Sequence, residues 1–412
     1  MYTRPGQMSP FYPSDVLSDL AIELIEKSSG LDGAIAPQTA RALEELMLHT
    51  NSYYSNLIEG QHTRPLAVQA NVKTQAKSKS DLVTLGAAHI KTEKASRQWV
   101  DAGDNPFRTE FVLRLHREFY SLLPESMRQV KYKNEMLVVN AGEWRKGNVE
   151  VGDHVAASHE AIPHLMEEFV NLYKPNNSNK AVNLLRVVAG HHRFEWIHPF
   201  LDGNGRVGRL LTHTWLRAAG IMGSGLWSIS RGLARNREAY LNSLQDADKT
   251  RQGNYDGRGN LSQKALDGFC RFMLTTAIDQ VEFMRSNFQF DFLDQRLKRA
   301  FEEFAISIPG IRKEGWLLAK TAIVMGHFER GEAERISGLG ERVSRDLLTS
   351  MIEHSLLASD SLKGRKVYAS FPVRAVSWYF PELFPPGDVL EYGKQLQIDD
   401  TQKSARRIPV RP

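Results

Sequence analysis

Residues 198–209 bring together the residue types that handle a nucleoside triphosphate. Their sequence is His-Pro-Phe-Leu-Asp-Gly-Asn-Gly-Arg-Val-Gly-Arg. Gly203 and Gly205 let the backbone turn tightly and present bare N–H groups, and a helix that begins there directs the positive end of its dipole at the same point. The segment therefore predicts an anion-binding loop.

The charged side chains of this loop extend the prediction from an anion to a triphosphate. Arg206 and Arg209 share one face of the expected helix, so both can donate forked hydrogen bonds to phosphate oxygens. Asp202 is a hard oxygen ligand of the kind that Mg²⁺ accepts when substrate phosphates supply other ligands. His198 is of a type that titrates near neutral pH and can take a proton from an attacking hydroxyl group. We expect Phe200 to face the core and hold the loop still.

Two other glycine-rich sites fit this loop less well. Residues 203–208 match the dinucleotide-binding pattern G-x-G-x-x-G, but that pattern needs a preceding strand and an acidic residue about 20 positions further on. Here a helix is expected before the loop, and residues 223–225 are Gly-Ser-Gly. A calcium-binding loop needs glycine and glutamate where this chain has Val207 and His213. A plain turn between helices does not call for an acid, an amide and two arginines.

Every fixed position of residues 198–209 matches the signature of the Fic family, which reads His-any-Phe-any-Asp or Glu-Gly-Asn-Gly-Arg-any-any-Arg. The resemblance covers residues 40–285. It implies that a hydroxyl of a Tyr, Thr or Ser in a target protein, or in this chain, attacks the α-phosphate of ATP and that pyrophosphate leaves. The roles it implies are base for His198, Mg²⁺ ligand for Asp202, phosphate cradle for Gly203, Asn204 and Gly205, and phosphate clamps for Arg206 and Arg209. The intact Gly205 favours transfer of AMP over transfer of phosphate.

A second motif of the same family lies at residues 55–60, Ser-Asn-Leu-Ile-Glu-Gly. Its pattern, Ser or Thr, three residues, Glu, then Gly or Asn, resembles the family's inhibitory motif, carried here by Ser55, Glu59 and Gly60. A glutamate in the last turn of a helix opposes the helix dipole and benefits from a cationic partner. The resemblance implies that Arg209 is this partner and that the enzyme is autoinhibited by Glu59; a solvated glutamate at a helix end is the alternative.

Helices must position these motifs. Apolar spacing predicts helices over residues 15–26, 40–58, 109–122, 159–173, 180–196 and 205–220, and a helical stretch over 262–304. Residues 143–153 predict a hairpin with its turn at Lys-Gly-Asn, 146–148. The resemblance makes this hairpin the flap that pairs with a target backbone, and an ordinary surface hairpin explains the spacing equally well. Tyr240 lies in a region that resembles the family's nucleoside enclosure, although core packing accounts for it too.

The order of elements changes after residue 318. We expect helices over 319–328, 332–337 and 342–354 and two short strands around 363–365, which is the order of a winged helix-turn-helix. Basic residues there could reach DNA: Arg342, Arg345, Lys363, Arg365 and Lys366. Acidic residues beside them make the basic face thin: Glu341, Asp346 and Glu353. We favour formation of a homodimer or presentation of a protein target over DNA binding.

Composition bounds the class of protein. The 412 residues allow two or three domains, with 42% hydrophobic and 25% charged residues, as in soluble globular proteins. The net charge of +5 fits ATP, a nucleic acid or an acidic protein and selects none of them. The single cysteine, Cys270, excludes an internal disulfide and a cysteine-built zinc site. No apolar run suggests a membrane span or a signal segment, so we expect a cytoplasmic protein.

These observations combine into one prediction. The fold is mainly α, a Fic-type helical core with a small β-hairpin flap and a C-terminal winged helix-turn-helix. The expected domains are an N-terminal helical region with the inhibitory motif (1–105), the Fic core (106–285), the winged helix (286–375) and a tail (376–412). The expected activity is Mg²⁺-dependent AMP transfer from ATP. Two alternatives stay open: removal of AMP, with Glu59 positioning water, and a DNA-binding regulator whose Fic core senses nucleotide.

Overall fold

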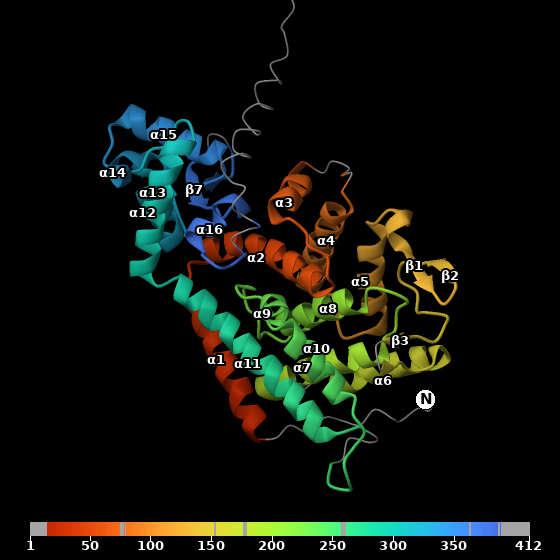
Figure 1. The fold of residues 1–412 in the computed structure, drawn as a ribbon. Helices are drawn as coiled ribbons and strands as arrows, with labels where there is room; N and C mark the ends of the chain where they lie inside the picture. Colours follow the sequence, from red (N-terminus) through yellow and green to blue (C-terminus); the bar gives the residue numbers. More distant parts are fainter. Residues whose placement is uncertain are drawn as a thin grey trace, which may run out of the picture. The chain divides into compact units, whose positions relative to one another are not determined.

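The computed structural model describes residues 15–74, 78, 80–151, 154–175, 179–256, 261–361, 364–385 and 388. The fold is mainly helical, as predicted (Figure 1). The helices are α1 (Asp15–Ala34), α2 (Pro37–Ile58), α3 (Pro65–Thr74), α4 (Asp81–Asp101), α5 (Thr109–Ser121), α6 (Ile162–Tyr173), α7 (Lys180–Ile197), α8 (Asn204–Ala218), α9 (Ile229–Arg235), α10 (Arg237–Ala247), α11 (Gln263–Asn287), α12 (Phe290–Ser307), α13 (Gly315–Met325), α14 (Ala333–Ser337), α15 (Glu341–Glu353) and α16 (Val376–Tyr379). The strands are β1 (Gln129–Tyr132), β2 (Glu135–Val138), β3 (Glu150–Val151), β4 (His154–Val155), β5 (His327–Glu329), β6 (Leu357–Ser359) and β7 (Lys366–Ala369).

The chain folds into two compact units. The first takes in the described residues of Met1–Asp32, Asn51–Thr63 and Ala70–Phe283, and the second those of Gly33–Thr50, Arg64–Gln69 and Met284–Pro412. The last turns of α2, which carry the inhibitory motif, therefore belong to the same unit as residues 198–209. The division into four domains remains a prediction.

Helices α7 and α8 form the centre of the first unit. They pack against each other, with α6 against α7 and with α4 and α5 against α8. Nearly all residues of α7 are buried, including Leu184, Leu185 and every residue from Val187 to Phe194. This is typical of a helix enclosed on all sides. Asn179 starts α7, because its side chain accepts hydrogen bonds from the N–H groups of Ala181 and Val182. The short loop between α7 and α8 is thus held by two buried helices.

The predicted hairpin is present, but its turn was placed wrongly. Glu150 of β3 pairs with Val155 of β4, and the connection lies between residues 151 and 154 rather than at 146–148. Asn148 instead makes hydrogen bonds with His159 and Tyr132, which lie outside the hairpin. Its side chain accepts from the N–H of His159, 3.0 Å away, and its carbonyl accepts from the Tyr132 hydroxyl.

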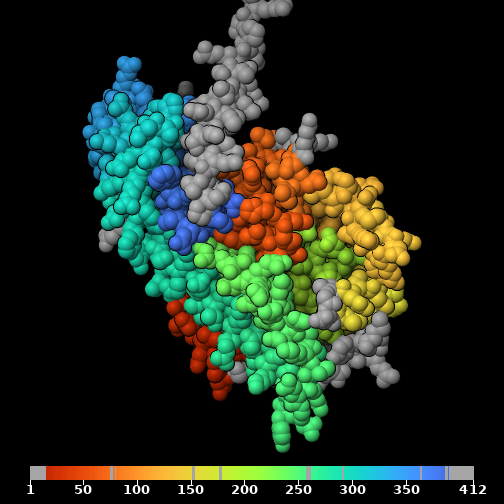
Figure 2. Space-filling model, in the orientation of Figure 1, coloured from red at the N-terminus to blue at the C-terminus, as the bar shows by residue number. Residues whose placement is uncertain are grey.

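A second hairpin, β1 with β2, was not predicted. Gln129 pairs with Val138 and Tyr132 with Glu135. The hairpin lies on the surface in Figure 2, and Met136 on β2 is exposed. Its strands are only four residues long. β1 alternates between exposed and half-buried side chains, whereas β2 is mostly exposed, so the alternation that marks a half-buried strand is short here.

The second unit contains a three-stranded antiparallel sheet with the strand order β5-β7-β6. The predicted succession of three helices and two strands is found as α13, α14, α15, β6 and β7. The expected helix over 319–328 ran too far, because Gly326 adopts a φ of 82° that ends α13 and β5 follows. The stretch over 262–304 is two helices, α11 and α12. The winged helix stays a prediction, and Lys363 and most of the expected tail lie outside the described residues.

Two predictions from composition can be compared with the structure. Cys270 is buried in α11. Among the residues that the structure describes, no helix combines the length and the apolar character that a bilayer-spanning segment needs.

Candidate active site

The loop between α7 and α8 has an unusual backbone at both ends. His198 ends α7 with φ 51° and ψ 60°, a left-handed conformation that is uncommon for a residue other than glycine. Gly203 precedes α8 with a φ of 83°, and a Cβ there would collide with the ring of Tyr120. Only glycine combines this backbone with this close approach. The loop is therefore fixed before any ligand arrives.

Side chains within the loop hold its shape. Phe200 is fully buried and stacks on His116, with ring centroids 3.8 Å apart, as predicted for a core-facing residue. Asn204 closes the loop on itself: its side chain donates to the Phe200 carbonyl at 2.9 Å and accepts from the Phe200 N–H at 2.8 Å. A contribution of Asn204 to a phosphate cradle would thus come from its backbone N–H, because its amide side chain is fully engaged with Phe200.

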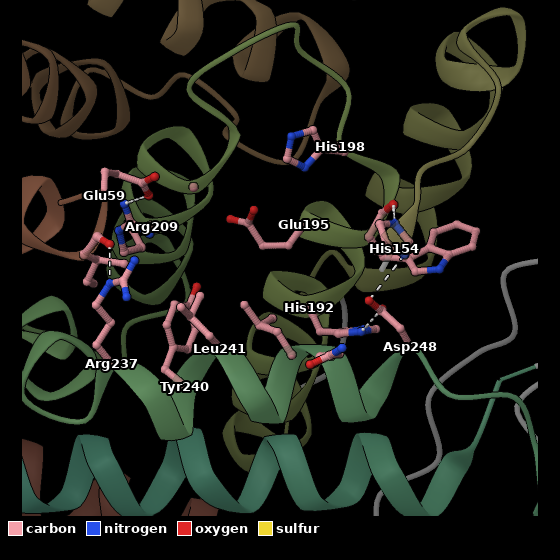
Figure 3. A pocket seen from close by; sticks show the side chains of 15 residues that line it. Glu59, His154, His192, Glu195, His198, Arg209, Arg237, Tyr240, Leu241 and Asp248 are labelled. Atoms are coloured by element: carbon pink, nitrogen blue, oxygen red, sulfur yellow. Dashed lines mark hydrogen bonds and ion pairs between the residues drawn. The ribbon is translucent and has the colours of Figure 1, made fainter. Parts of the chain in front are cut away.

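A cavity of about 520 Å³ opens beside the loop (Figure 3). His198, Gly205 and Arg209 line it from the loop and from α8, and Glu59 and Tyr240 line it from the end of α2 and from α10. Its size lies within the usual range for small-molecule sites, about 300–1,000 Å³. Helix α8 begins at Asn204, so its free N–H groups and the positive end of its dipole lie at this cavity.

His198 is poised to accept a proton. Burial lowers its pKa to about 4, although a hydrogen bond with the backbone carbonyl of Glu195 raises it in part. The ring is therefore neutral at neutral pH. Since one ring nitrogen donates its hydrogen to that carbonyl, the other is left as the acceptor.

Asp202 lies at the turn before α8 and is held by Tyr120. The Tyr120 hydroxyl donates to Oδ2 of Asp202 at 2.6 Å, and the backbone carbonyl of Asp202 is 3.3 Å from Nε2 of His116. In the described part of the chain, no group of three or more His, Cys, Asp or Glu side chains is placed to hold a metal ion. One oriented carboxylate fits a Mg²⁺ ion that takes its remaining ligands from phosphates and water.

The two arginines of the motif have different environments. Arg206 is buried, with its Cζ 5.5 Å from the centroid of the Phe119 ring, and its Nε lacks a hydrogen-bond partner among the described residues. Arg209 is fully engaged by the end of α2. Its Nε donates to the Ser55 hydroxyl at 2.9 Å, and its Nη2 donates to the Ser55 carbonyl at 3.0 Å and to Oε1 of Glu59 at 2.6 Å.

Glu59 lies over the start of α8. A Cβ at Gly205 would collide with Oε1 of Glu59, so the carboxylate rests directly on the backbone expected to cradle phosphate. Burial raises the pKa of Glu59, but the charges of Arg209 and Arg206 together lower it by more. The net shift of the pKa is downward, so the group is ionised. A negative charge in this place both occupies the cradle and neutralises its arginine.

The end of α2 is built to present Glu59 at the cavity. Gly60 adopts a φ of 76°, its N–H donates to the Leu57 carbonyl, and the N–H of Gln61 donates to the Asn56 carbonyl. This pair of bonds is the Schellman motif, which ends a helix and leaves Glu59 as the C-cap. The role of Gly60 in the motif is therefore conformational.

Tyr240 is fully buried, and its hydroxyl lies 2.8 Å from Nε2 of His191. It also lines the cavity beside Leu241, which is 39% exposed. Both interpretations of Tyr240 from the sequence thus describe its place in part, since it packs in the core and forms a cavity wall.

The structure adds four residues that the sequence did not single out. Arg145 donates to the His198 carbonyl at 2.8 Å, and Arg237 donates to the Ile58 carbonyl, the last of α2, at 2.6 Å. His154 of β4 pairs with Asp248 at 3.3 Å. None of these residues belongs to a motif, and each contact joins segments far apart in sequence. The structure also brings Glu195 to the site. Its sequence position could have indicated this, because Glu195 lies only three residues before His198.

Comparison with known proteins agrees with this geometry. Residues 106–216 match the model of the Fic/DOC family. The chain is 27% identical over 157 residues to the protein adenylyltransferase Fic of Drosophila mojavensis, covering 38% of this chain and 31% of that protein. It is 37% identical over 82 residues to the protein of the same name from Drosophila grimshawi, covering 20% and 17%. The chain thus matches less than a third of the length of these relatives.

Solved structures share the fold. A Fic family protein from Desulfovibrio desulfuricans superposes with a TM-score of 0.52 at 18% identity, over 88% of this chain and 98% of that one. A Fic domain containing signaling protein from Bacteroides thetaiotaomicron superposes with a TM-score of 0.50 at 19% identity, over 64% and 95%. At these identities the likeness concerns the fold alone. Together with the family match, it establishes that residues 106–216 of this chain form a Fic domain.

Proposed function

We propose that this protein transfers AMP from ATP to a hydroxyl group of a protein, or of itself, and that Glu59 restrains the reaction. The observation that carries the proposal is the assembly of His198, Gly205 and Arg209 around one cavity, with the carboxylate of Glu59 on Arg209. Asp202 lies in the same loop, where the Tyr120 hydroxyl holds its carboxylate. The protein adenylyltransferases named above share sequence with this part of the chain.

The chemistry follows from the placement of these groups. Neutral His198 takes the proton from the target hydroxyl, whose oxygen forms a bond to the α-phosphorus of ATP. The bond from that phosphorus to the bridging oxygen of the β-phosphate breaks, and pyrophosphate leaves. The N–H groups at the start of α8, together with Arg206 and Arg209, stabilise the negative charge of the phosphates. Asp202 would hold Mg²⁺, which supplies charge neutralisation on the phosphates.

Autoinhibition follows from competition for Arg209. While Glu59 holds its Nη2, this arginine cannot offer that donor to the γ-phosphate. A triphosphate that enters the cavity also meets the carboxylate over Gly205. We therefore place the resting protein in an inhibited state.

The test uses mass and label. Protein is incubated with ATP labelled in the α-phosphate, with Mg²⁺ and a lysate, and AMP addition is detected by autoradiography and mass spectrometry. We expect Glu59→Gly to raise incorporation, and we expect the double variant Glu59→Gly, His198→Ala to show none. Absence of AMP on any protein in the Glu59→Gly sample would refute the proposal.

Removal of AMP from a modified protein is a second candidate. Glu59 lines the same cavity as His198, and a third of its side chain is exposed there, so it could position a water molecule. Loss of AMP from a pre-modified target with wild-type protein, but not with Glu59→Gly, would favour this function.

A further inference from the structure

Glu195 is a buried carboxyl group that the motifs leave without a role. It lies on α7, three residues before His198, and both residues line the cavity. Its Oε1 is shielded from solvent and has no hydrogen-bond partner among the described residues. Figure 3 shows its carboxyl group pointing into the cavity, between Arg209 and His198. A buried polar atom without a partner is costly, and such atoms are rare unless a ligand completes them.

Room for Glu195 is made by a glycine of the facing helix. A Cβ at Gly208 on α8 would collide with Oε1 of Glu195. Gly208 precedes Arg209 and occupies a position that the motif of the family leaves open. The carboxyl group therefore rests on the backbone of α8, beside the arginine that we assign to the γ-phosphate.

We propose that Glu195 contacts the nucleotide directly, its carboxyl group donating a hydrogen bond to the phosphate chain between His198 and Arg209. This inference rests on the proposed function, which sets where the phosphates of ATP lie: the α-phosphate must lie near His198 and the γ-phosphate near Arg209. The carboxyl group lies between the two (Figure 3). An ionised carboxylate would repel phosphate there, whereas a neutral carboxyl group can donate a hydrogen bond.

The surroundings favour the neutral form. Burial raises the pKa of Glu195 to about 8, and Glu59 adds to the increase while Arg209 opposes it. Tyr240, which also interacts with Glu195, stays neutral because burial raises its own pKa. A bound triphosphate adds negative charge and raises the pKa of Glu195 further. Nucleotide binding therefore requires a proton on Glu195 and weakens as pH rises past the point at which the free protein loses it.

Calorimetry with α,β-methylene-ATP tests this without any transfer reaction. The parent is Glu59→Gly, which leaves Arg209 open, and the variants are Glu195→Gln and Glu195→Ala in that background. Near pH 7 we expect Glu195→Gln, a permanent donor, to bind as the parent does within about threefold, and Glu195→Ala to bind about tenfold more weakly. Glu167→Ala, an exposed glutamate of α6, is the matched control and leaves the affinity unchanged.

The dependence on pH separates this role from simple packing. Between about pH 7 and pH 9.5 we expect the parent to lose about tenfold in affinity, and Glu195→Gln to lose much less, because it has no proton to lose. AMP, which lacks the β- and γ-phosphates, should show a smaller effect of Glu195→Ala than the triphosphate does. Parallel pH curves for the parent and Glu195→Gln, or parent-like affinity of Glu195→Ala, would overturn the proposal. Binding with this pattern but no AMP transfer would refute only the proposed function.

Discussion

The charge of Glu59 can be removed while its shape is kept, and this is the sharpest test of the proposed inhibited state. In Glu59→Gln, the amide oxygen can still accept a hydrogen bond from Nη2 of Arg209, which now lies 2.6 Å from Oε1. The ion pair is lost, whereas Glu59→Gly removes both the charge and the atoms that cover Gly205. The two variants therefore separate electrostatic restraint from steric restraint.

The magnitude follows from the burial of the two partners. Unit charges about 4 Å apart attract by about 4 kcal/mol at an effective dielectric constant of about 20. Arg209 is 2% exposed, but the Glu59 side chain is 33% exposed and partly screened by solvent, and well-exposed pairs contribute only about 0–1 kcal/mol. A net value of about 1–2 kcal/mol lies between these limits. It corresponds to about a 5- to 30-fold increase in transfer by Glu59→Gln, since about 1.4 kcal/mol is tenfold.

The assay is the initial rate of AMP incorporation from labelled ATP at subsaturating concentration. We expect the order Glu59→Gly, then Glu59→Gln, then wild type, and no incorporation when His198→Ala is added to either variant. A Glu59→Gln rate equal to that of wild type would show that the charge restrains nothing and that Glu59 acts through its bulk alone. Equal rates for wild type and both variants would show that Glu59 does not regulate the reaction.

Four further outcomes follow from contacts around the site. Arg237→Ala removes the side chain that donates a hydrogen bond to the last carbonyl of α2. We expect this variant to loosen the end of the helix and to raise basal AMP transfer about two- to fivefold, which corresponds to about 0.5–1 kcal/mol. An unchanged basal rate would contradict this prediction. Tyr120→Phe removes the hydrogen bond that orients Asp202. We expect a loss of about 10- to 100-fold in Mg²⁺ affinity or activity, measured as the Mg²⁺ dependence of the rate in the Glu59→Gly background. A Mg²⁺ curve superimposed on that of the parent would refute the assignment of Asp202 as the Mg²⁺ ligand. Ser55→Ala, also in the Glu59→Gly background, should lower AMP transfer several-fold, because the Ser55 hydroxyl accepts the hydrogen bond that holds Nε of Arg209 in place. A raised rate would place Ser55 among the inhibitory groups. Titration of His198 should not change the rate of Glu59→Gly between about pH 8 and about pH 5.5, since burial lowers the pKa of His198 to about 4 and the base stays neutral. A decline of the rate centred near pH 6.5 and caused by His198 would show that the ring is not held neutral.

The sequence predicted the parts of the site that depend on local order. A helix, a turn rich in glycine and a second helix bring residues 198–209 together because neighbours in sequence are neighbours in a loop. The contact between Glu59 and Arg209 was also expected, yet only through the likeness to a family. Nothing in the spacing of two residues 150 positions apart predicts an ion pair, because packing of α2 against α8 decides it.

The remaining contacts could not be predicted for the same physical reason. Arg145 reaches the His198 carbonyl across 53 positions of sequence, and Arg237 reaches the Ile58 carbonyl across 179. Both are ordinary arginines in sequence, and both acceptors are backbone atoms, which every residue has. The hairpin shows the complementary limit: alternating valines predicted its strands, but the hydrogen bonds of Asn148 with distant residues excluded the turn that the local sequence favoured.

The inhibitory motif contains two functions that the contacts separate. Ser55 binds Arg209 through its hydroxyl and its carbonyl, and neither contact occupies the position over Gly205. The Glu59 carboxylate lies over that glycine, beside Nη1 of Arg209, and supplies the opposing charge. When the carboxylate leaves, the guanidinium keeps both bonds to Ser55, so it is already oriented when a γ-phosphate arrives and loses little rotamer freedom on binding. We therefore propose that the end of α2 restrains the reaction with Glu59 and orients Arg209 with Ser55, so that displacement of Glu59 alone would release the activity.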